Sequence, residues 1–324
     1  MTVLTPEAVR PSDAPTLDVD RNFADSILAG LTASRKSIES KWLYDVEGSR
    51  LFDAITTLEE YYPTRVETGI LERHAPDLAA LLPPDAALVE LGSGSSVKTR
   101  LVLDALPGLS AYVPIDISAA HLDGAARALS ADYPEIDVQP LAADFTDRIV
   151  LPAALAERPK LLFFPGSTIG NFDPGGALAL LARLRVLPRV TGLVIGFDLI
   201  KDESVLVRAY DDSKGVTAAF NLNLLVRINR ELGADFDVGA FRHEARWNRA
   251  ANRIEMHLVS RRPQTVSVLG RRIDFAADES IHTENSHKYS VSGFRDFAAS
   301  AGWRTYAAWM DAETRFAVSV LQPA

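Results

Sequence analysis

Residues 88–94 read Leu-Val-Glu-Leu-Gly-Ser-Gly, an apolar strand pattern that ends in a glycine turn, with an acid two residues before the turn. A strand ending in Gly-x-Gly lets the backbone approach a ligand closely, at the crevice of a doubly wound α/β sheet. Two later apolar runs also end in acids, at Asp116 and at Asp144-Phe145. Three successive strand ends presenting Glu90, Asp116 and Asp144 therefore predict a pocket for an adenosine-containing cofactor.

Strand and helix patterns alternate on both sides of this stretch. Alternation of this kind predicts right-handed crossovers and a mostly parallel sheet. The expected strands lie near 87–91, 111–115, 137–142, 160–165 and 192–198, and the expected helices near 97–106, 118–132 and 174–186. Residues 22–71 have a helical pattern, and 253–260, 264–268 and 272–275 have strand patterns that follow helices at 204–210 and 215–232. A last helix at 292–301 and strands at 305–309 and 316–321 are expected to complete the first sheet.

Composition limits the class of function. The chain has 324 residues, 24% of them charged, and a formal net charge of −9, which argues against a nucleic-acid partner. It has no cysteine, so disulfides and thiolate chemistry are excluded. Residues 1–20 resemble a flexible tail rather than a signal peptide, and no apolar run approaches membrane-spanning length. We expect a cytoplasmic protein that does not bind membranes.

The glycine turn at 92–99 allows three nucleotide chemistries. The phosphate-loop motif and the dinucleotide-binding motif both require glycine at the position where this chain has Val97. An S-adenosylmethionine site tolerates a bulkier residue because this cofactor has no pyrophosphate, and its cationic sulfonium and amino groups suit an acidic crevice. The residues alone favour S-adenosylmethionine, with an unliganded fold as the remaining alternative. The residues of this set are Glu90, Gly92, Gly94, Asp116, Asp144 and Phe145.

Two other chemistries are less well supported by the sequence. Residues 166–170 read Gly-Ser-Thr-Ile-Gly and place threonine where a nucleophile elbow usually has serine, with no aligned histidine. The six histidines show no metal-ligand spacing with carboxylate or cysteine partners, so no catalytic metal is expected. His282 and His287 are expected in surface loops.

Eight motifs along the chain recur in one order in a known family. They are Lys41–Asp45, Glu60–Arg65, Val89–Gly94, Gly166–Asn171, Arg208–Asp212, Ala218–Asn221, Arg253–Met256 and Thr283–Ser286. With these motifs the chain closely resembles the histidine-specific, S-adenosylmethionine-dependent methyltransferases of ergothioneine biosynthesis. The resemblance covers roughly residues 22–324.

The resemblance implies an enzyme that methylates the α-amino group of free L-histidine three times, giving hercynine. It also implies an α/β fold in which a Rossmann-type methyltransferase sheet is joined to a second, α+β substrate-binding domain, in a monomer. The implied division is a tail at 1–20, a substrate-binding domain at 21–64 and 202–288, and a cofactor domain at 65–201 and 289–324.

The site residues follow from matching positions. The resemblance adds Lys98 to the cofactor set. It assigns the substrate's α-carboxylate and amino end to Tyr61, Asn171 and Tyr210, which also take the catalytic positioning role. The imidazole is assigned to Glu284 and Ser286, with Tyr44 assisting and Met256 in the pocket wall. Val97 and Asn285 depart from the family pattern without touching these contacts.

Two other functions remain open from the sequence. One is an N-methyltransferase for another aromatic amino acid or amine, such as tryptophan. An indole has one hydrogen-bond donor and no acceptor, so it matches an acid at 284 beside a hydroxyl at 286 less well than an imidazole does. The other is a regulator that binds S-adenosylmethionine without catalysis.

Overall fold

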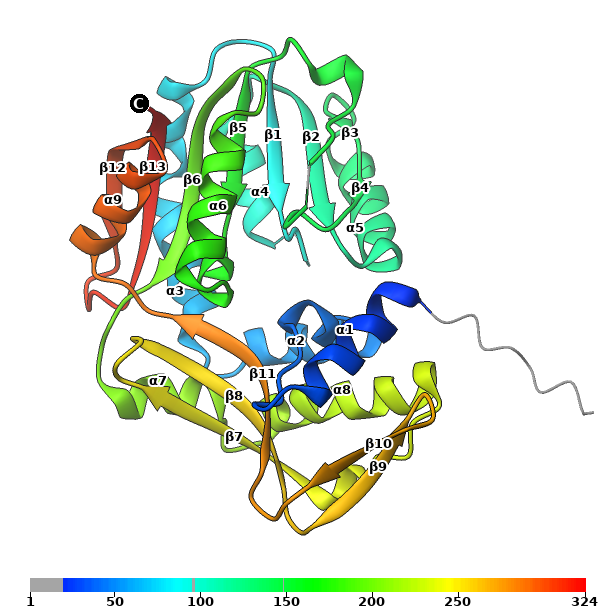
Figure 1. Ribbon diagram of the computed structural model, residues 1–324. Coiled ribbons are helices and arrows are strands. Elements are labelled where there is room, and N and C mark those ends of the chain that lie inside the picture. The colour runs from blue at the N-terminus through cyan, green and yellow to red at the C-terminus, as the bar shows by residue number, and fades with distance from the viewer. Residues whose placement is uncertain (1–19, 95–96, 148) are drawn as a thin grey trace, which may run out of the picture.

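The computed structural model describes residues 20–94, 97–147 and 149–324 (Figure 1). Its largest sheet contains β1 (Ala86–Leu91), β2 (Leu109–Asp116), β3 (Asp137–Val138), β4 (Leu141–Ala142), β5 (Lys160–Phe164), β6 (Val190–Asp198), β12 (Trp303–Met310) and β13 (Phe316–Pro323). The strand order is β12-β13-β6-β5-β1-β2-β3, with β4 also paired to β2. Strands β1 to β6 run parallel, whereas β13 is antiparallel to both β6 and β12.

Helices cover both faces of this sheet (Figure 1). They are α3 (Tyr62–His74), α4 (Val97–Ala105), α5 (Ala119–Asp132), α6 (Pro174–Arg185) and α9 (Val291–Ser300). Side chains alternate along β1, so Leu88 packs in the core that contains α3 and α4, and Val89 packs in the core that contains α6 and α9. Burial on both faces explains why these strands have uninterrupted apolar sequences.

The remaining α-helices and the small sheets lie beyond the carboxyl ends of β1, β2 and β5 (Figure 1). A three-stranded antiparallel sheet orders β11 (Ser280–His287), β8 (Arg253–Ser260) and β7 (Phe241–Asn248), and β9 (Gln264–Val268) pairs with β10 (Arg271–Phe275). Helices α1 (Arg21–Thr32), α2 (Val46–Thr56), α7 (Glu203–Tyr210) and α8 (Val216–Leu232) pack around these strands. The short 3₁₀ helices are η1 (Ser40–Leu43), η2 (Ala75–Leu81), η3 (Ala153–Leu155), η4 (Thr168–Asn171) and η5 (Val238–Ala240). One core cluster joins both parts, since it includes Leu88 of β1 and Leu224 of α8.

Side-chain caps fix the helix starts that position the site. Asp45 accepts a hydrogen bond from the Gly48 amide at 2.8 Å and so begins α2. The same carboxylate accepts from Asn223 at 2.8 Å and from Arg230 at 2.6 Å, both on α8. The three contacts explain why α2, and Tyr44 just before it, are held against α8.

The alternation predicted from the sequence is confirmed: the fold is α/β, with a mostly parallel sheet and separate small antiparallel sheets. The expected strand at 137–142 is two short strands, because Pro140 between them has no amide to give to the ladder. Strands β7 and β11 were not predicted. The placement of His282 and His287 in surface loops is wrong, because both lie in β11, paired with β8, and His287 is 6% exposed.

Two further expectations concern the N-terminal tail and membrane-spanning helices. The predicted tail at 1–20 falls almost entirely on residues 1–19, which lie outside the described residues. Within the described ranges, no helix combines the length and the apolar character that crossing a bilayer requires.

Candidate active site

A cavity of about 870 Å³ lies between the carboxyl ends of the parallel strands and β11. Gly92, Asp116 and Glu284 all line it, so the predicted cofactor side and the predicted imidazole side open into one space. The predicted residues on its wall are Tyr44, Tyr61, Glu90, Gly92, Gly94, Lys98, Asp116, Asp144, Phe145, Asn171 and Glu284. Tyr210, Met256 and Ser286 are not on this wall.

The glycine turn after β1 forms the floor of the cavity. Gly92 and Gly94 have φ angles of +69° and +47°, which glycine adopts without steric cost. The Gly92 amide donates to the Ile115 carbonyl at 2.8 Å, and the Asp116 carboxylate accepts from the amides of Gly94 (3.4 Å) and Ser118 (2.9 Å). The turn therefore brings an acid and an open stretch of backbone to the same point.

Glu90 connects the end of β1 to its neighbours. It is 1% exposed and accepts hydrogen bonds from Thr99 at 2.7 Å and from Tyr112 at 2.5 Å. Burial raises its pKa to about 7, against the lowering effect of these two hydrogen bonds. Glu90 thus has a structural task in addition to its place on the cavity wall.

Lys98 is held by an acid that sequence reasoning missed. Its ammonium donates to Glu67 of α3 at 2.6 Å, and Glu67 also accepts from the Gly166 amide at 2.8 Å and 3.0 Å. Glu67 is 0% exposed. It therefore joins α3, α4 and the turn after β5 next to the cavity. No local sequence motif predicts this set of contacts.

Asp144 and Phe145 complete the cofactor side. Asp144 accepts from the Thr146 amide at 2.8 Å and pairs with Lys41 at 3.1 Å. Burial disfavours its charged form, but the Thr146 and Lys41 contacts hold its pKa below the usual value. Phe145 packs edge-on against Phe164, with ring centroids 5.6 Å apart. The Lys41 contact links the segment before α2 to the cofactor side.

Glu284 is the buried acid of the opposite wall. It is 9% exposed, and its Oε2 atom has no hydrogen-bond partner among the residues that the structure describes. Burial raises its pKa to about 8 despite the lowering effect of Lys288. The β11–β8 register shifts between His282 and Glu284. The bulge at Thr283 sends that hydroxyl to Asn221 at 2.7 Å and leaves Glu284 facing the cavity.

Three tyrosines surround this acid. The Tyr61 ring is 6.0 Å from the Tyr210 ring and 6.2 Å from the Phe52 ring, both edge-on, and Tyr44 packs on Phe52 and Phe220. Burial, with the nearby Glu284 carboxyl, raises the pKa of Tyr44, Tyr61 and Tyr210 well above the ordinary value. The three phenols are therefore neutral near pH 7 and act as hydrogen-bonding groups.

A polar network lies next to this wall, two residues along β11 from Glu284. The hydroxyls of Tyr210 and Ser286 are 2.7 Å apart, and the Lys288 ammonium donates to them at 2.9 Å and 2.7 Å. Lys288 also pairs with Asp198 at 2.8 Å, and both side chains are 0% exposed. Lys288 was missed in the sequence, although it shares the strand alternation of Glu284 and Ser286. Met256 is buried on β8 opposite Glu284.

Asn171 reaches the cavity from η4, which follows β5. Ser167 at the start of η4 has a φ of +59°, and its hydroxyl accepts from the Asp198 amide at 3.0 Å. A Cβ atom at Gly170 would lie 2.8 Å from the His287 carbonyl oxygen, so glycine lets η4 pack against β11. The Thr168 hydroxyl donates to the Pro165 carbonyl at 3.0 Å, a turn contact and not the arrangement of a nucleophile.

The histidines are less isolated than the sequence indicates. Glu255, His257 and His282 offer donor atoms that all lie within 4.8 Å of one another, because the β8–β11 register brings them together. The expectation that no catalytic metal takes part stays a prediction.

The sheet order, with antiparallel β13 between β6 and β12, and the cavity at the carboxyl ends of β1 and β2 define a doubly wound α/β protein with a ligand-binding crevice at the edge of its sheet. A family model described as "Histidine-specific methyltransferase, SAM-dependent" matches residues 23–323. The chain belongs to this family.

Curated relatives agree with this assignment. The chain is 44% identical over 300 residues to a histidine N-alpha-methyltransferase of Mycolicibacterium smegmatis, covering 91% of this chain and 92% of that protein. It is 43% identical to the protein of the same name from Mycobacterium tuberculosis, with the same coverage. It is 27% identical to a 4-dimethylallyltryptophan N-methyltransferase of Trichophyton verrucosum, covering 90% and 92% of the two chains.

Proposed function

We propose that this enzyme transfers methyl groups from S-adenosylmethionine to the α-amino group of free L-histidine, three times, giving hercynine for ergothioneine biosynthesis. The observation that carries the proposal is the Oε2 atom of Glu284, which is buried, unpartnered and on the wall of the cavity that Gly92 and Asp116 also line. A buried carboxyl oxygen requires a hydrogen-bond partner, and an imidazole nitrogen supplies one. The family match and the two mycobacterial relatives support the same substrate.

The cofactor side suits S-adenosylmethionine. A Cβ atom at Gly94 would meet no atom of the described residues within 4 Å, so this part of the turn leaves room for a ligand. We propose that Asp116 accepts from ribose hydroxyls, that the acidic residues Glu90 and Asp144 favour a cationic ligand, and that Phe145 contacts its adenine ring. Lys98, held by Glu67, and Gly92 complete this side. When bound, S-adenosylmethionine supplies a methyl group activated by a sulfonium.

The substrate side positions an amine. We propose that Glu284 and Ser286 read the two imidazole nitrogens, with Tyr44 beside them. Tyr61, Asn171 and Tyr210 then hold the α-carboxylate and direct the amine toward the cofactor side. In-line methyl transfer needs a deprotonated nitrogen about 3 Å from the methyl carbon, so positioning is the main task of the chain. Since the three phenols stay neutral, they orient the amine as donors and leave its proton to solvent.

The small antiparallel sheets lie within residues 202–288, and the strands of the large sheet lie within 65–201 and 289–324. We propose that residues 202–288, with 21–64, form the substrate-binding domain and that the remainder forms the cofactor domain. One chain supplies both sides of the cavity, which supports catalysis by a monomer.

The direct test is incubation of the purified protein with S-adenosylmethionine and free histidine, followed by mass spectrometry. We expect products one, two and three methyl groups heavier than histidine. A matched panel includes tryptophan, because one relative is named for a tryptophan derivative. Faster turnover of tryptophan than of histidine would favour that substrate class, and cofactor binding without any methylated product would favour a regulator.

Asp116→Ala is expected to raise the Kd for S-adenosylmethionine about 10- to 100-fold, because hydrogen bonds to a charged acceptor contribute roughly 1.5–3 kcal/mol. Calorimetric titration of the cofactor into the histidine-free protein measures this. Asp137→Ala is the control, since Asp137 is an exposed acid on β3 that pairs near the other end of β2. An unchanged Kd for the Asp116 variant would remove this residue from the site.

A further inference from the structure

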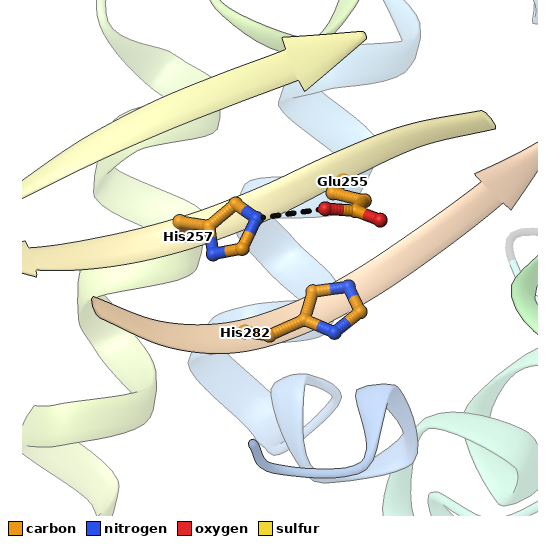
Figure 2. Close-up of side chains that lie close together, drawn as sticks. All are labelled: Glu255, His257 and His282. Carbon is orange, nitrogen blue, oxygen red and sulfur yellow. Dashed lines mark hydrogen bonds and ion pairs between the residues drawn. The ribbon is translucent and has the colours of Figure 1, made fainter. Parts of the chain in front are cut away.

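Glu255, His257 and His282 present three side chains of metal-ligand type on one face of the β8–β11 pair (Figure 2). His282 lies directly opposite His257 in the antiparallel register, and their rings stack with centroids 5.0 Å apart. Glu255 precedes His257 by two residues and therefore shares its face of the strand. In Figure 2 the carboxylate and the two rings converge from the two strands.

Each of the three side chains is held by a further contact. Nδ1 of His257 lies 3.3 Å from the Ser280 hydroxyl, and Nε2 of His282 lies 3.0 Å from the Glu284 carbonyl oxygen. These contacts occupy one nitrogen of each ring, as outer contacts do in known metal sites, while the second nitrogen of His257 faces the Glu255 carboxylate. Oε1 of Glu255 accepts from Arg253 at 2.8 Å and from Asn248 at 2.9 Å, whereas Oε2 faces Nε2 of His257 at 3.2 Å.

The charges around the cluster determine which ion it suits. The nearby arginines are matched by acids, Arg253 by Glu255 and Arg246 by Glu244. A net negative field, which Ca²⁺ and Mg²⁺ sites require, is therefore lacking here. Two imidazoles and one carboxylate instead form a donor set of the zinc class.

We propose that Glu255, His257 and His282 bind one divalent ion of the zinc class, with solvent in the fourth position. The donor atoms lie within 4.8 Å of one another. Donors around a tetrahedral zinc ion are about 3.3 Å apart, so small side-chain rotations close the site. The ion is distinct from the methyl-transfer machinery. His282 also lines the active-site cavity, so the bound ion fixes β11 next to Glu284.

The test uses the full-length chain without an affinity tag, in the absence of histidine and S-adenosylmethionine. Zn²⁺ is titrated by calorimetry, and Co²⁺ is titrated by its visible absorption, which reports tetrahedral coordination. We expect one ion per chain, and a Kd raised by at least about 100-fold in His257→Gln and in His282→Gln. Glu255→Gln keeps the side-chain shape and is expected to weaken binding about tenfold.

His74→Gln is the matched control, because His74 faces Asp77 on the protein surface and stacks on Trp309, outside the cluster. It is expected to bind both ions as the unmodified chain does. Circular dichroism checks that each variant is folded. The proposal would be overturned if the unmodified chain bound neither ion. It would also be overturned if the His257 and His282 variants bound Zn²⁺ as tightly as the unmodified chain does. Because no substrate is present, this result is independent of the methyl-transfer assay.

Discussion

Glu284→Ala is expected to lower kcat/KM for histidine about 100- to 1000-fold while the Kd for S-adenosylmethionine changes less than about twofold. The variant removes a hydrogen bond at a buried carboxyl and leaves an imidazole nitrogen unpaired. Together these effects cost about 3–4 kcal/mol, and each 1.4 kcal/mol is a factor of ten. Steady-state kinetics at saturating cofactor and calorimetric titration of the cofactor measure the two quantities.

Two variants sharpen this experiment. Glu284→Gln keeps the shape and one hydrogen bond, so we expect an intermediate loss. Glu279→Ala changes an acid that immediately precedes β11 and pairs with Lys36 away from the cavity. It is expected to keep the KM for histidine within about twofold, as surface substitutions usually do. Equal loss of histidine and cofactor affinity in Glu284→Ala would contradict a role in reading the imidazole.

The cofactor side of the cavity could be predicted from the sequence because its parts are local. Glu90, Asp116 and Asp144 each follow an apolar strand, and the carboxyl ends of parallel strands meet at one edge of a sheet. The glycines at 92 and 94 mark the turn for the same local reason, since a positive φ restricts the residue type. No knowledge of distant pairing is needed for these positions.

The substrate side depends on long-range pairing, which the sequence does not display. Residues 283–287 are polar and have the composition of a solvated loop, yet they lie in strand β11 and all but Asn285 are buried. They do so because β8 pairs with one edge of this strand. In addition, Asn221 of α8 accepts a hydrogen bond from the Thr283 hydroxyl, and the Tyr210 hydroxyl of α7 is hydrogen-bonded to the Ser286 hydroxyl. The resemblance supplied Glu284 and Ser286, and the physics of their burial became visible only in three dimensions.

Several partners were missed for the same reason. Glu67 is on α3, far in sequence from Lys98 and Gly166, which it joins. The contact of His257 with His282 follows from the register of β8 and β11, and no sequence spacing encodes it. Lys288 is the exception, because its two-residue spacing from Ser286 places it on the same face of an extended segment.

Lys288→Met is expected to destabilise the folded state by about 3 kcal/mol, because removing one partner of a buried ion pair leaves the other charge poorly compensated. Burial opposes the charged form of Asp198, but Lys288 and Lys201 hold its pKa below the usual value. A fall in Tm of about 4–5 °C corresponds to this loss in a chain of 324 residues, because the unfolding entropy is roughly 2 cal/mol/K per residue. Differential scanning calorimetry measures it. Binding should weaken too, with the KM for histidine raised about tenfold, because the hydroxyls of Tyr210 and Ser286 lose their donor.

Lys201→Met separates the two effects. Lys201 pairs with the same carboxylate at 2.6 Å and donates to Tyr62, but it does not contact Tyr210 or Ser286. It is expected to lower Tm while leaving the KM for histidine nearly unchanged. If Lys288 served stability alone, both variants would lower Tm and neither would raise KM. A raised KM in Lys288→Met beside an unchanged KM in Lys201→Met would therefore assign Lys288 the task of orienting the Tyr210 and Ser286 hydroxyls toward the substrate.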